Sequence, residues 1–131
     1  MFVDTSGWID IVQGEPNALG WLHLASDERR EMGPAHTSDY VIAEAYSFIQ
    51  RNHRRADALR FLDAATRSSI VLHPSDADLV DRAMAEARKR SFKHELSLID
   101  WTSALLMRHH GIDHILTTDR GFAQLGFTVL P

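Results

Sequence analysis

The chain has 131 residues, of which 44% are hydrophobic and 24% are charged, as in a soluble domain with a core of its own. Its formal net charge of −4 argues against a general nucleic-acid coat protein, which is normally basic. No apolar run approaches the roughly 18 residues that a membrane helix needs, and the lack of cysteine excludes disulfides and cysteine-ligated zinc. The N-terminus does not have the residue order of a secretory signal, so we expect a cytoplasmic protein.

The first half of the chain alternates between short strands and helices. Phe2 and Val3 make a strand that is followed at once by an amphipathic stretch. Gly33 and Pro34 interrupt the second helix, and Ser38 is suited to be the N-cap of the third. The predicted elements are a strand at 2–3, a helix from 5 to about 12, a helix around 21–24 that runs to about 30, a strand at 35–37, a helix after 38 and a helix from about 56 to 66.

The second half continues the alternation. SDAD at 75–78 and SLID at 97–100 are similar to capping boxes and begin helices, and Gly111 is suited to end the second of these helices. The predicted elements are a strand at 68–74, a helix from 75 to about 90, a helix at 98–110, and strands at 114–118 and 127–130. Five short strands alternating with helices predict a single α/β domain over residues 1–131, with a short, mostly parallel five-stranded sheet and helices on both faces.

Four acidic residues occupy positions that an ordinary surface acid does not need. Sites in parallel sheets form at the carboxyl ends of strands. Asp4 directly follows the first strand, and Asp119 follows the strand at 114–118, so the two carboxylates converge if these strands are neighbours. Glu44 is spaced like the apolar residues of its helix, and Asp100 is surrounded by apolar neighbours in the sequence. We therefore expect all four acids to share one cleft.

Each acid also has an ordinary explanation when it is taken alone. Asp4 and Asp119 could cap the helix or turn that follows them. Asp100 could be only the third position of its capping box, and Glu44 could reach solvent or pair with an arginine. In one cleft, however, four ionised carboxylates would repel one another, and a divalent cation would remove that conflict. An oxygen-only ligand set favours Mg²⁺, with Mn²⁺ as the second choice.

Four stretches carry a resemblance to a known family: FVDTSGWI at 2–9, TSDYVIAEAY at 37–46, SLIDWTSALLM at 97–107 and ILTTDRGFAQLGF at 115–127. With them, the chain resembles the PIN-domain family over essentially its whole length, and in particular the VapC-type toxin ribonucleases of bacterial toxin–antitoxin pairs. The positions of the family's four acids, and of hydroxyl residues beside them, fall on Asp4, Glu44, Asp100, Asp119, Ser6 and Thr118.

The resemblance implies a Mg²⁺-dependent endoribonuclease that hydrolyses RNA phosphodiester bonds. Asp4, Asp100 and Asp119 would hold the ion, and Glu44 would orient or deprotonate the attacking water. The number of ions, one or two, is left open. The alternative is a catalytically silent PIN-like module that binds RNA or protein and has kept the acids.

Basic residues would hold the phosphates of the RNA on either side of the cut. Arg120 directly follows the fourth acid, and Arg90 and Lys93 lie just before the SLID helix. The alternative for such clusters is a solvated helix end. A further basic cluster consists of Arg51, Arg54 and Arg55.

The resemblance also implies partners, namely a second copy of the chain and a small antitoxin whose basic C-terminal segment covers the acidic cleft. Trp8, Trp21, Tyr46 and Phe48 lie on helices that offer apolar surface for such contacts. The tryptophans are expected in the core or in a dimer contact. The eight histidines show no ligand spacing, which predicts ordinary surface or core roles for them.

Overall fold

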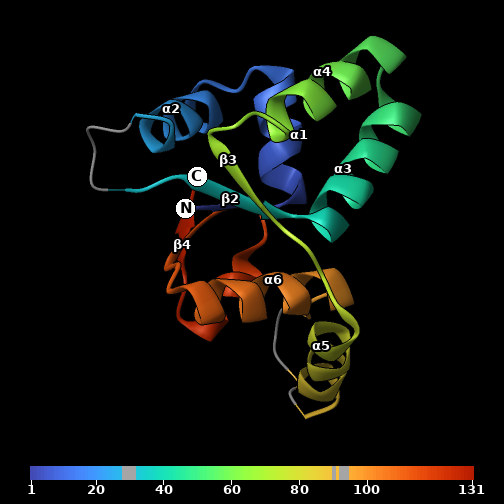
Figure 1. The fold of residues 1–131 in the computed structure, drawn as a ribbon, viewed down its shortest axis with the longest axis vertical. Coiled ribbons are helices and arrows are strands. Elements are labelled where there is room, and N and C mark those ends of the chain that lie inside the picture. The colour runs from blue at the N-terminus through green and yellow to red at the C-terminus, as the bar shows by residue number, and fades with distance from the viewer. Residues whose placement is uncertain (28–31, 90, 92–94) are drawn as a thin grey trace.

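The computed structural model describes residues 1–27, 32–89, 91 and 95–131 as one five-stranded sheet with helices on both faces (Figure 1). The strands are β1 (Phe2–Val3), β2 (Ala35–Ser38), β3 (Ile70–His73), β4 (His114–Leu116) and β5 (Thr128–Leu130). The helices are α1 (Thr5–Gln13), α2 (Pro16–Ala25), α3 (Asp39–Asn52), α4 (Arg55–Ala65), α5 (Ala77–Lys89), α6 (Leu98–His110) and the 3₁₀ helix η1 (Arg120–Leu125). In Figure 1, α1 to α4 lie on one side of the sheet and α5 and α6 on the other. The predicted fold class is confirmed.

The strand order β3-β2-β1-β4-β5 makes β1 the central strand, and every neighbouring pair is parallel. Val3 of β1 is paired with Leu116 of β4. The next residues along these two strands, Asp4 and Thr117, therefore emerge side by side at the carboxyl edge of the sheet. This edge is where parallel sheets form their sites.

Trp8 joins α1 to the sheet and to α4. Its side chain is fully buried, and its ring lies edge-on to Phe61, with 5.6 Å between the ring centroids. The indole Nε1 donates a hydrogen bond of 3.0 Å to Thr37 Oγ1, which in turn donates to the carbonyl of Val3. The expectation of Trp8 as a core residue is thus confirmed, and Trp8 itself contributes nothing to a contact surface. Trp101 is likewise buried, whereas Trp21 is only half-buried.

Several element boundaries differ from those that the sequence predicted. α2 begins at Pro16, contains Gly20 and ends at Ala25, short of the predicted end near residue 30. Before α5, the cap is Asp76, whose Oδ1 accepts a hydrogen bond from the Leu79 amide. Ser75 instead donates through its amide and its hydroxyl to the Asp39 carboxylate, which fastens the start of α5 to α3. Among the described residues, no helix is long and apolar enough to cross a membrane.

Histidines that are far apart in the sequence meet where β2, β3 and the end of α6 come together. His36 Nδ1 lies 2.9 Å from His73 Nε2, and the ring planes differ by only 11°. The ring centroids are 5.2 Å apart. This distance equals the nitrogen–nitrogen distance plus the radii of the two rings, so the rings lie edge to edge in nearly the same plane. They share an N–H···N hydrogen bond. The ring of His110 packs against the rings of His73 and His109, with 4.2 Å and 4.8 Å between the ring centroids.

Two members of this histidine cluster, His36 and His73, are held in the neutral state by their surroundings. Burial, followed by the charges of the N-terminal ammonium, His73 and His110, lowers the pKa of His36 to about 4. Burial and the neighbouring histidines also lower the pKa of His73. The cluster is a structural contact between the sheet and α6, which agrees with the expected role for histidines in this chain.

Gly7 lets α1 lie directly against β4. A β-carbon added at Gly7 would lie 2.4 Å from the carbonyl oxygen of Leu116 and 3.0 Å from its Cγ. Because the blocking atom belongs to the backbone of a central strand pair, it cannot move aside without displacing β4. The closeness of α1 to β4 also brings Ser6 to the end of β4.

We expect Gly7→Ala to destabilise the protein although alanine is the better helix former. The loss of unfolding free energy should be about 1–3 kcal/mol, the usual cost of overpacking a filled site. Gly20→Ala is the matched control, because Gly20 also lies within a helix but a β-carbon there meets no atom within 4 Å. That change should stabilise by about 0.5–1 kcal/mol. Urea unfolding measures both, and equal effects at the two positions would contradict the close approach of α1 to β4.

Candidate active site

Asp4 lies at the centre of the carboxyl edge of the sheet. It is the first residue after β1 and the N-cap residue of α1, and its backbone amide continues the β1–β4 ladder by donating to the Leu116 carbonyl at 3.2 Å. The residue is only 4% exposed. Its position is thus set by the two central strands and not by a loop.

A chain of hydrogen bonds fixes one oxygen of Asp4. The Thr117 hydroxyl donates to Asp4 Oδ2 at 3.0 Å, so its single proton is used there. Thr117 Oγ1 accepts from the Asp119 amide at 3.1 Å and lies 3.0 Å from Ser6 Oγ, whose hydroxyl is therefore the donor in that pair. Ser6 Oγ in turn accepts from the Thr118 amide at 2.9 Å. The hydroxyls all point their protons toward the carboxylate.

Thr117 is the functional residue that the sequence analysis missed. Of the two candidates in the TTD segment, Thr118 is exposed and contributes only its backbone amide, whereas Thr117 is 3% exposed and contributes the hydroxyl. Ser6, by contrast, lies where the sequence analysis placed it. The missing signal is the register of β1 and β4, which sets Thr117 opposite Asp4. Directly opposite residues of neighbouring strands point to the same face of a sheet.

The other oxygen of Asp4 has no such partner. Oδ1 is buried and finds no hydrogen bond within the described part of the chain. Burial, and after it the charge of Asp100, raises the pKa of Asp4 from 3.8 to about 7. A buried acceptor without a donor is rare in folded proteins and calls for an ion or a water. Asp4 is thus a carboxylate whose ionised form lacks the positive charge that it needs.

Asp100 faces Asp4 from the first turn of α6. Its Oδ2 accepts from the Ser97 amide at 2.7 Å, and its own amide donates to the Ser97 hydroxyl at 3.1 Å, so the predicted capping box is formed. Burial raises the pKa of Asp100, and the charges of Asp119 and Glu44 raise it further. Asp100 is therefore both a helix cap and one of the converging acids, and these two explanations do not exclude each other.

Asp119 and Glu44 complete the group from two further elements. Asp119 is half-buried, and its Oδ1 accepts from the Gly121 amide at 2.7 Å, which starts η1. Glu44 is exposed and accepts a hydrogen bond from the Thr5 hydroxyl at the start of α1. The expected position of Glu44 on the apolar stripe is corrected. The buried residues of α3 are Val41, Ala45 and Ile49, and Glu44 lies beside this row on the exposed part of the helix.

The four acids come from the segments after β1 and β4 and from α3 and α6, and their charges act on one another. The charge of Asp100 acts on Asp4, and the charges of Asp119 and Glu44 act on Asp100. Over the residues that the structure describes, no three acidic or histidine side chains already stand as a closed metal-binding group. The donor set nevertheless fits a hard cation, because all its atoms are carboxylate oxygens and Asp4 Oδ1 is buried without a donor.

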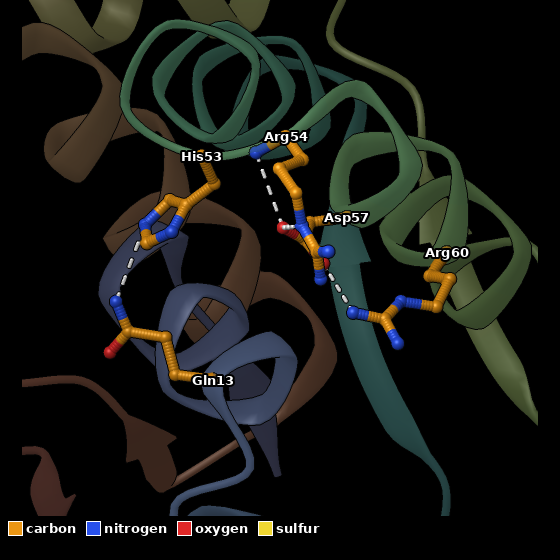
Figure 2. A network of polar contacts seen from close by, with 5 residues as sticks. All are labelled: Gln13, His53, Arg54, Asp57 and Arg60. Carbon is orange, nitrogen blue, oxygen red and sulfur yellow. Dashed lines mark hydrogen bonds and ion pairs between the residues drawn. The ribbon is translucent and has the colours of Figure 1, made fainter.

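The basic residues divide into those at the cleft and those away from it. Arg120 is exposed and begins η1 directly after Asp119. Arg90 and Lys93 lie outside the described residues. Figure 2 shows a network at the start of α4, where Asp57 lies between Arg54 and Arg60 and hydrogen-bonds Arg60.

The network at α4 reduces the charge available to a ligand. The Arg60 hydrogen bond is the main cause that lowers the pKa of Asp57, so this carboxylate stays ionised beside the two arginines. His53 and Gln13 form the neighbouring contact of 3.4 Å that links the end of α3 to α1 (Figure 2). Arg54 and Arg60 thus have Asp57 as a structural partner. Among the described basic residues, Arg120 is the one that directly follows an acid of the candidate site.

Comparison with known proteins identifies the class of this fold and site. The model of the PIN domain matches residues 1–128, and the chain belongs to the PIN-domain family. Nucleases of this family use a divalent metal ion. The resemblance that the sequence analysis drew from four short stretches is confirmed.

The relatives that match include one toxin in particular. The chain is 32% identical over 133 residues to the 23S rRNA-specific endonuclease VapC20 of Mycobacterium tuberculosis, in strains CDC 1551 / Oshkosh and H37Rv, with 97% of this chain and 95% of VapC20 covered. The crystal structure of M. tuberculosis VapC20, described as a sarcin–ricin loop cleaving toxin, matches with a TM-score of 0.84. That superposition has 24% identity and covers 99% of this chain and 98% of the other, and it shows the shared fold.

Replacing the two neighbouring threonines separates their roles. Thr117→Val keeps the side-chain shape but removes the hydroxyl that donates to Asp4 Oδ2, and the unfolding free energy in metal-free buffer should fall by about 1–3 kcal/mol. Thr118→Val alters an exposed side chain, and the unfolding free energy of this variant should stay within about 0.5 kcal/mol of the wild-type value. Denaturant melts in EDTA test this, and a larger loss for Thr118→Val would reverse the assignment.

The raised pKa of Asp4 predicts how stability depends on pH and metal. A folded-state pKa of about 7 against 3.8 means that ionising Asp4 disfavours the native state progressively as pH rises from about 4 to 7. In EDTA at pH 7.5, Asp4→Asn should therefore melt several degrees above wild type, and the difference should vanish near pH 4. Mg²⁺ should close or reverse the gap at pH 7.5, since a ligand at a hundred times its Kd adds roughly 2.7 kcal/mol to the protein that binds it.

Thermal melts of both proteins at the two pH values, with and without Mg²⁺, make this comparison. If Asp4 is merely a helix cap, asparagine serves equally well, and the two proteins will respond in parallel to Mg²⁺ and to pH. Such parallel behaviour would remove Asp4 from the metal site.

Proposed function

We propose that the chain is a metal-dependent endoribonuclease that hydrolyses RNA phosphodiester bonds and acts as the toxin of a type II toxin–antitoxin pair. The observation that carries the proposal is the buried Oδ1 of Asp4, which has no hydrogen-bond partner among the described residues, together with the charges of Asp100 and Glu44 that act on Asp4 and the charge of Asp119 that acts on Asp100. Membership of the PIN-domain family and the likeness to an rRNA-specific endonuclease support the same activity.

The side chains have different tasks according to their burial. Asp4, Asp100 and Asp119 each have one oxygen anchored by a hydrogen bond, from Thr117, the Ser97 amide and the Gly121 amide. These three would hold Mg²⁺, or Mn²⁺ in its place. When bound, the ion would polarise the scissile phosphate and offset the charge that develops on its oxygens.

Glu44 is suited to act on the attacking water. It is the exposed member of the group, so water reaches it directly, and the Thr5 hydroxyl fixes one of its oxygens. The other carboxylate oxygen of Glu44 would accept a proton from the water as the new bond to phosphorus forms and the bond from phosphorus to the leaving ribose oxygen breaks. Protons also compete with the metal at Asp4, whose raised pKa makes the site retain a proton near neutral pH.

RNA is the proposed substrate, and 23S rRNA is the first RNA to test because VapC20 is named for it. Arg120, which is exposed and follows Asp119, would contact a phosphate next to the scissile one, and the same role is proposed for Arg90 and Lys93. The net charge of −4 means that such contacts are local.

A homodimer and a small antitoxin are the proposed protein partners. Exposed apolar side chains occur on several helices and include Leu19, Phe48 and Leu59, which would suit contacts between copies of the chain. A basic segment of an antitoxin would suit the acidic cleft, where arginine forms charge-assisted hydrogen bonds with carboxylates. The alternative function is a catalytically silent PIN-like module that binds RNA or protein and has kept the acids.

Amide variants of the four acids test the activity. Asp4→Asn, Glu44→Gln, Asp100→Asn and Asp119→Asn should each lower RNA cleavage in Mg²⁺ by at least about 100-fold, because each removes a charge that acts on the ion or the water. Asp63→Asn, on the exposed side of α4, is the control and should cleave like wild type.

The measurement is single-turnover cleavage of total RNA and of 23S rRNA, with circular dichroism to confirm that each variant is folded. Near wild-type rates in two of the four variants would refute the assignment of the site. Cleavage by none of the proteins, including wild type, together with retained RNA binding, would favour the silent module.

A further inference from the structure

A small apolar cavity opens between α3, α5 and α6. It has a volume of about 250 Å³ and is lined by Tyr40, Val80, Leu98, Ile99 and Thr102. The hydroxyl of Thr102 donates to the Ile99 carbonyl at 2.6 Å, so the cavity gains no free polar group from it. Tyr40 and Leu98 are among the exposed large hydrophobic side chains of the protein, at 37% and 43% exposure.

Three residues that line the cavity are close in the sequence to two of the four acids. Tyr40 precedes Glu44 by four residues on α3, so the two side chains are neighbours on the same face of that helix. Leu98 and Ile99 come directly before Asp100 in the first turn of α6. Two walls of the cavity are therefore formed by residues that neighbour Glu44 and Asp100 along the chain.

We propose that this cavity receives the base of a nucleotide next to the scissile phosphate, with the base stacked on the Tyr40 ring. The inference rests on the proposed ribonuclease function and assigns to it a base-binding subsite. Proteins recognise single-stranded RNA by splaying out bases and stacking them on aromatic side chains. A base is joined to its phosphate through one ribose, so a pocket for the base has to lie near the acids that act on that phosphate. An apolar side chain of a protein partner could bind anywhere on the surface and does not require that position.

The chemistry of the walls determines what the subsite can distinguish. Its lining side chains are aliphatic or aromatic, apart from the Tyr40 hydroxyl and the engaged Thr102. Such walls contact the face of a base and make few hydrogen bonds with its edge. The subsite should therefore prefer purines, which have the larger face, and should discriminate weakly between adenine and guanine.

The test combines a change in the protein with a change in the RNA. In Mg²⁺, Tyr40→Ala should lower kcat/KM on an RNA that wild type cleaves by roughly 5- to 150-fold, mainly through KM, which corresponds to the loss of one base–aromatic stack. Tyr40→Phe keeps the ring and should stay within about twofold of wild type. Leu72→Ala, which changes an exposed apolar residue on β3, is the surface control and should have no effect.

The decisive comparison uses RNA with an abasic site on either side of the cleaved bond. At one of these two positions, removing the base should lower the rate of cleavage by wild type as much as Tyr40→Ala lowers it on intact RNA. The same abasic RNA should be cleaved by the Tyr40→Ala variant no more slowly than intact RNA. Equal abasic effects in wild type and Tyr40→Ala at both positions would overturn the proposal. A Tyr40→Ala variant that cleaves normally but loses its dimer or its antitoxin would also overturn it and would assign the cavity to a protein contact.

A binding measurement separates this subsite from the nuclease function itself. RNA carrying 2-aminopurine at the same position, titrated in EDTA, should lose fluorescence on stacking with wild type and with Tyr40→Phe but not with Tyr40→Ala. If wild type shows this Tyr40-dependent quenching without cleaving RNA in Mg²⁺, the nuclease function fails and the subsite stands. If it cleaves RNA with no dependence on Tyr40 in either assay, the subsite fails and the nuclease function stands.

Discussion

The burial of Asp4 at the end of the central strand is the constraint from which the rest of the site follows. A buried carboxylate is costly unless it is hydrogen-bonded and its charge is compensated. Pairing of β1 with β4 places Thr117 beside it and satisfies Oδ2, and the close packing of α1 at Gly7 brings Ser6 to the same point. None of these contacts satisfies Oδ1 or supplies a positive charge. The fold thus specifies a carboxylate that is rigidly held and electrostatically incomplete, which is the condition that a bound cation would relieve.

The other three acids are arranged around Asp4 in order of decreasing burial. Asp100 and Asp119 are half-buried and anchored by backbone amides, whereas Glu44 is exposed and anchored by a side-chain hydroxyl. This order suits a division of tasks. A rigid, dehydrated carboxylate favours holding an ion, and a wetter one favours exchange of protons with water. The same arrangement is unfavourable without the ion, because each carboxylate raises the energy of its ionised neighbours.

The sequence could predict most of the architecture because the elements are local. Short strands that alternate with amphipathic helices indicate a parallel sheet, and the strand ends locate Asp4 and Asp119. The capping box at Ser97 and Asp100 is likewise readable from four residues. What sequence reasoning missed depends on contacts between distant segments. The choice of Thr117 over Thr118 requires the β1–β4 register, and the contact of His36 with His73 requires two strands to be placed side by side.

The apolar cavity at Tyr40 and the acidic residues would bind two different parts of an RNA, namely a base and the neighbouring phosphate. A phosphate backbone is repelled by carboxylates until a cation bridges them, so the cleft alone gives a poor hold on RNA. Stacking on an aromatic ring does not depend on charge, and it would hold a neighbouring base while the cation positions the phosphate. With a net charge of −4 the chain has no general attraction for nucleic acid, which makes an uncharged contact next to the reacting bond more valuable than it would be on a basic protein. A site built in this way gains its selectivity from the geometry between cavity and cleft, because only an RNA able to unstack one base within reach of the acids can use both.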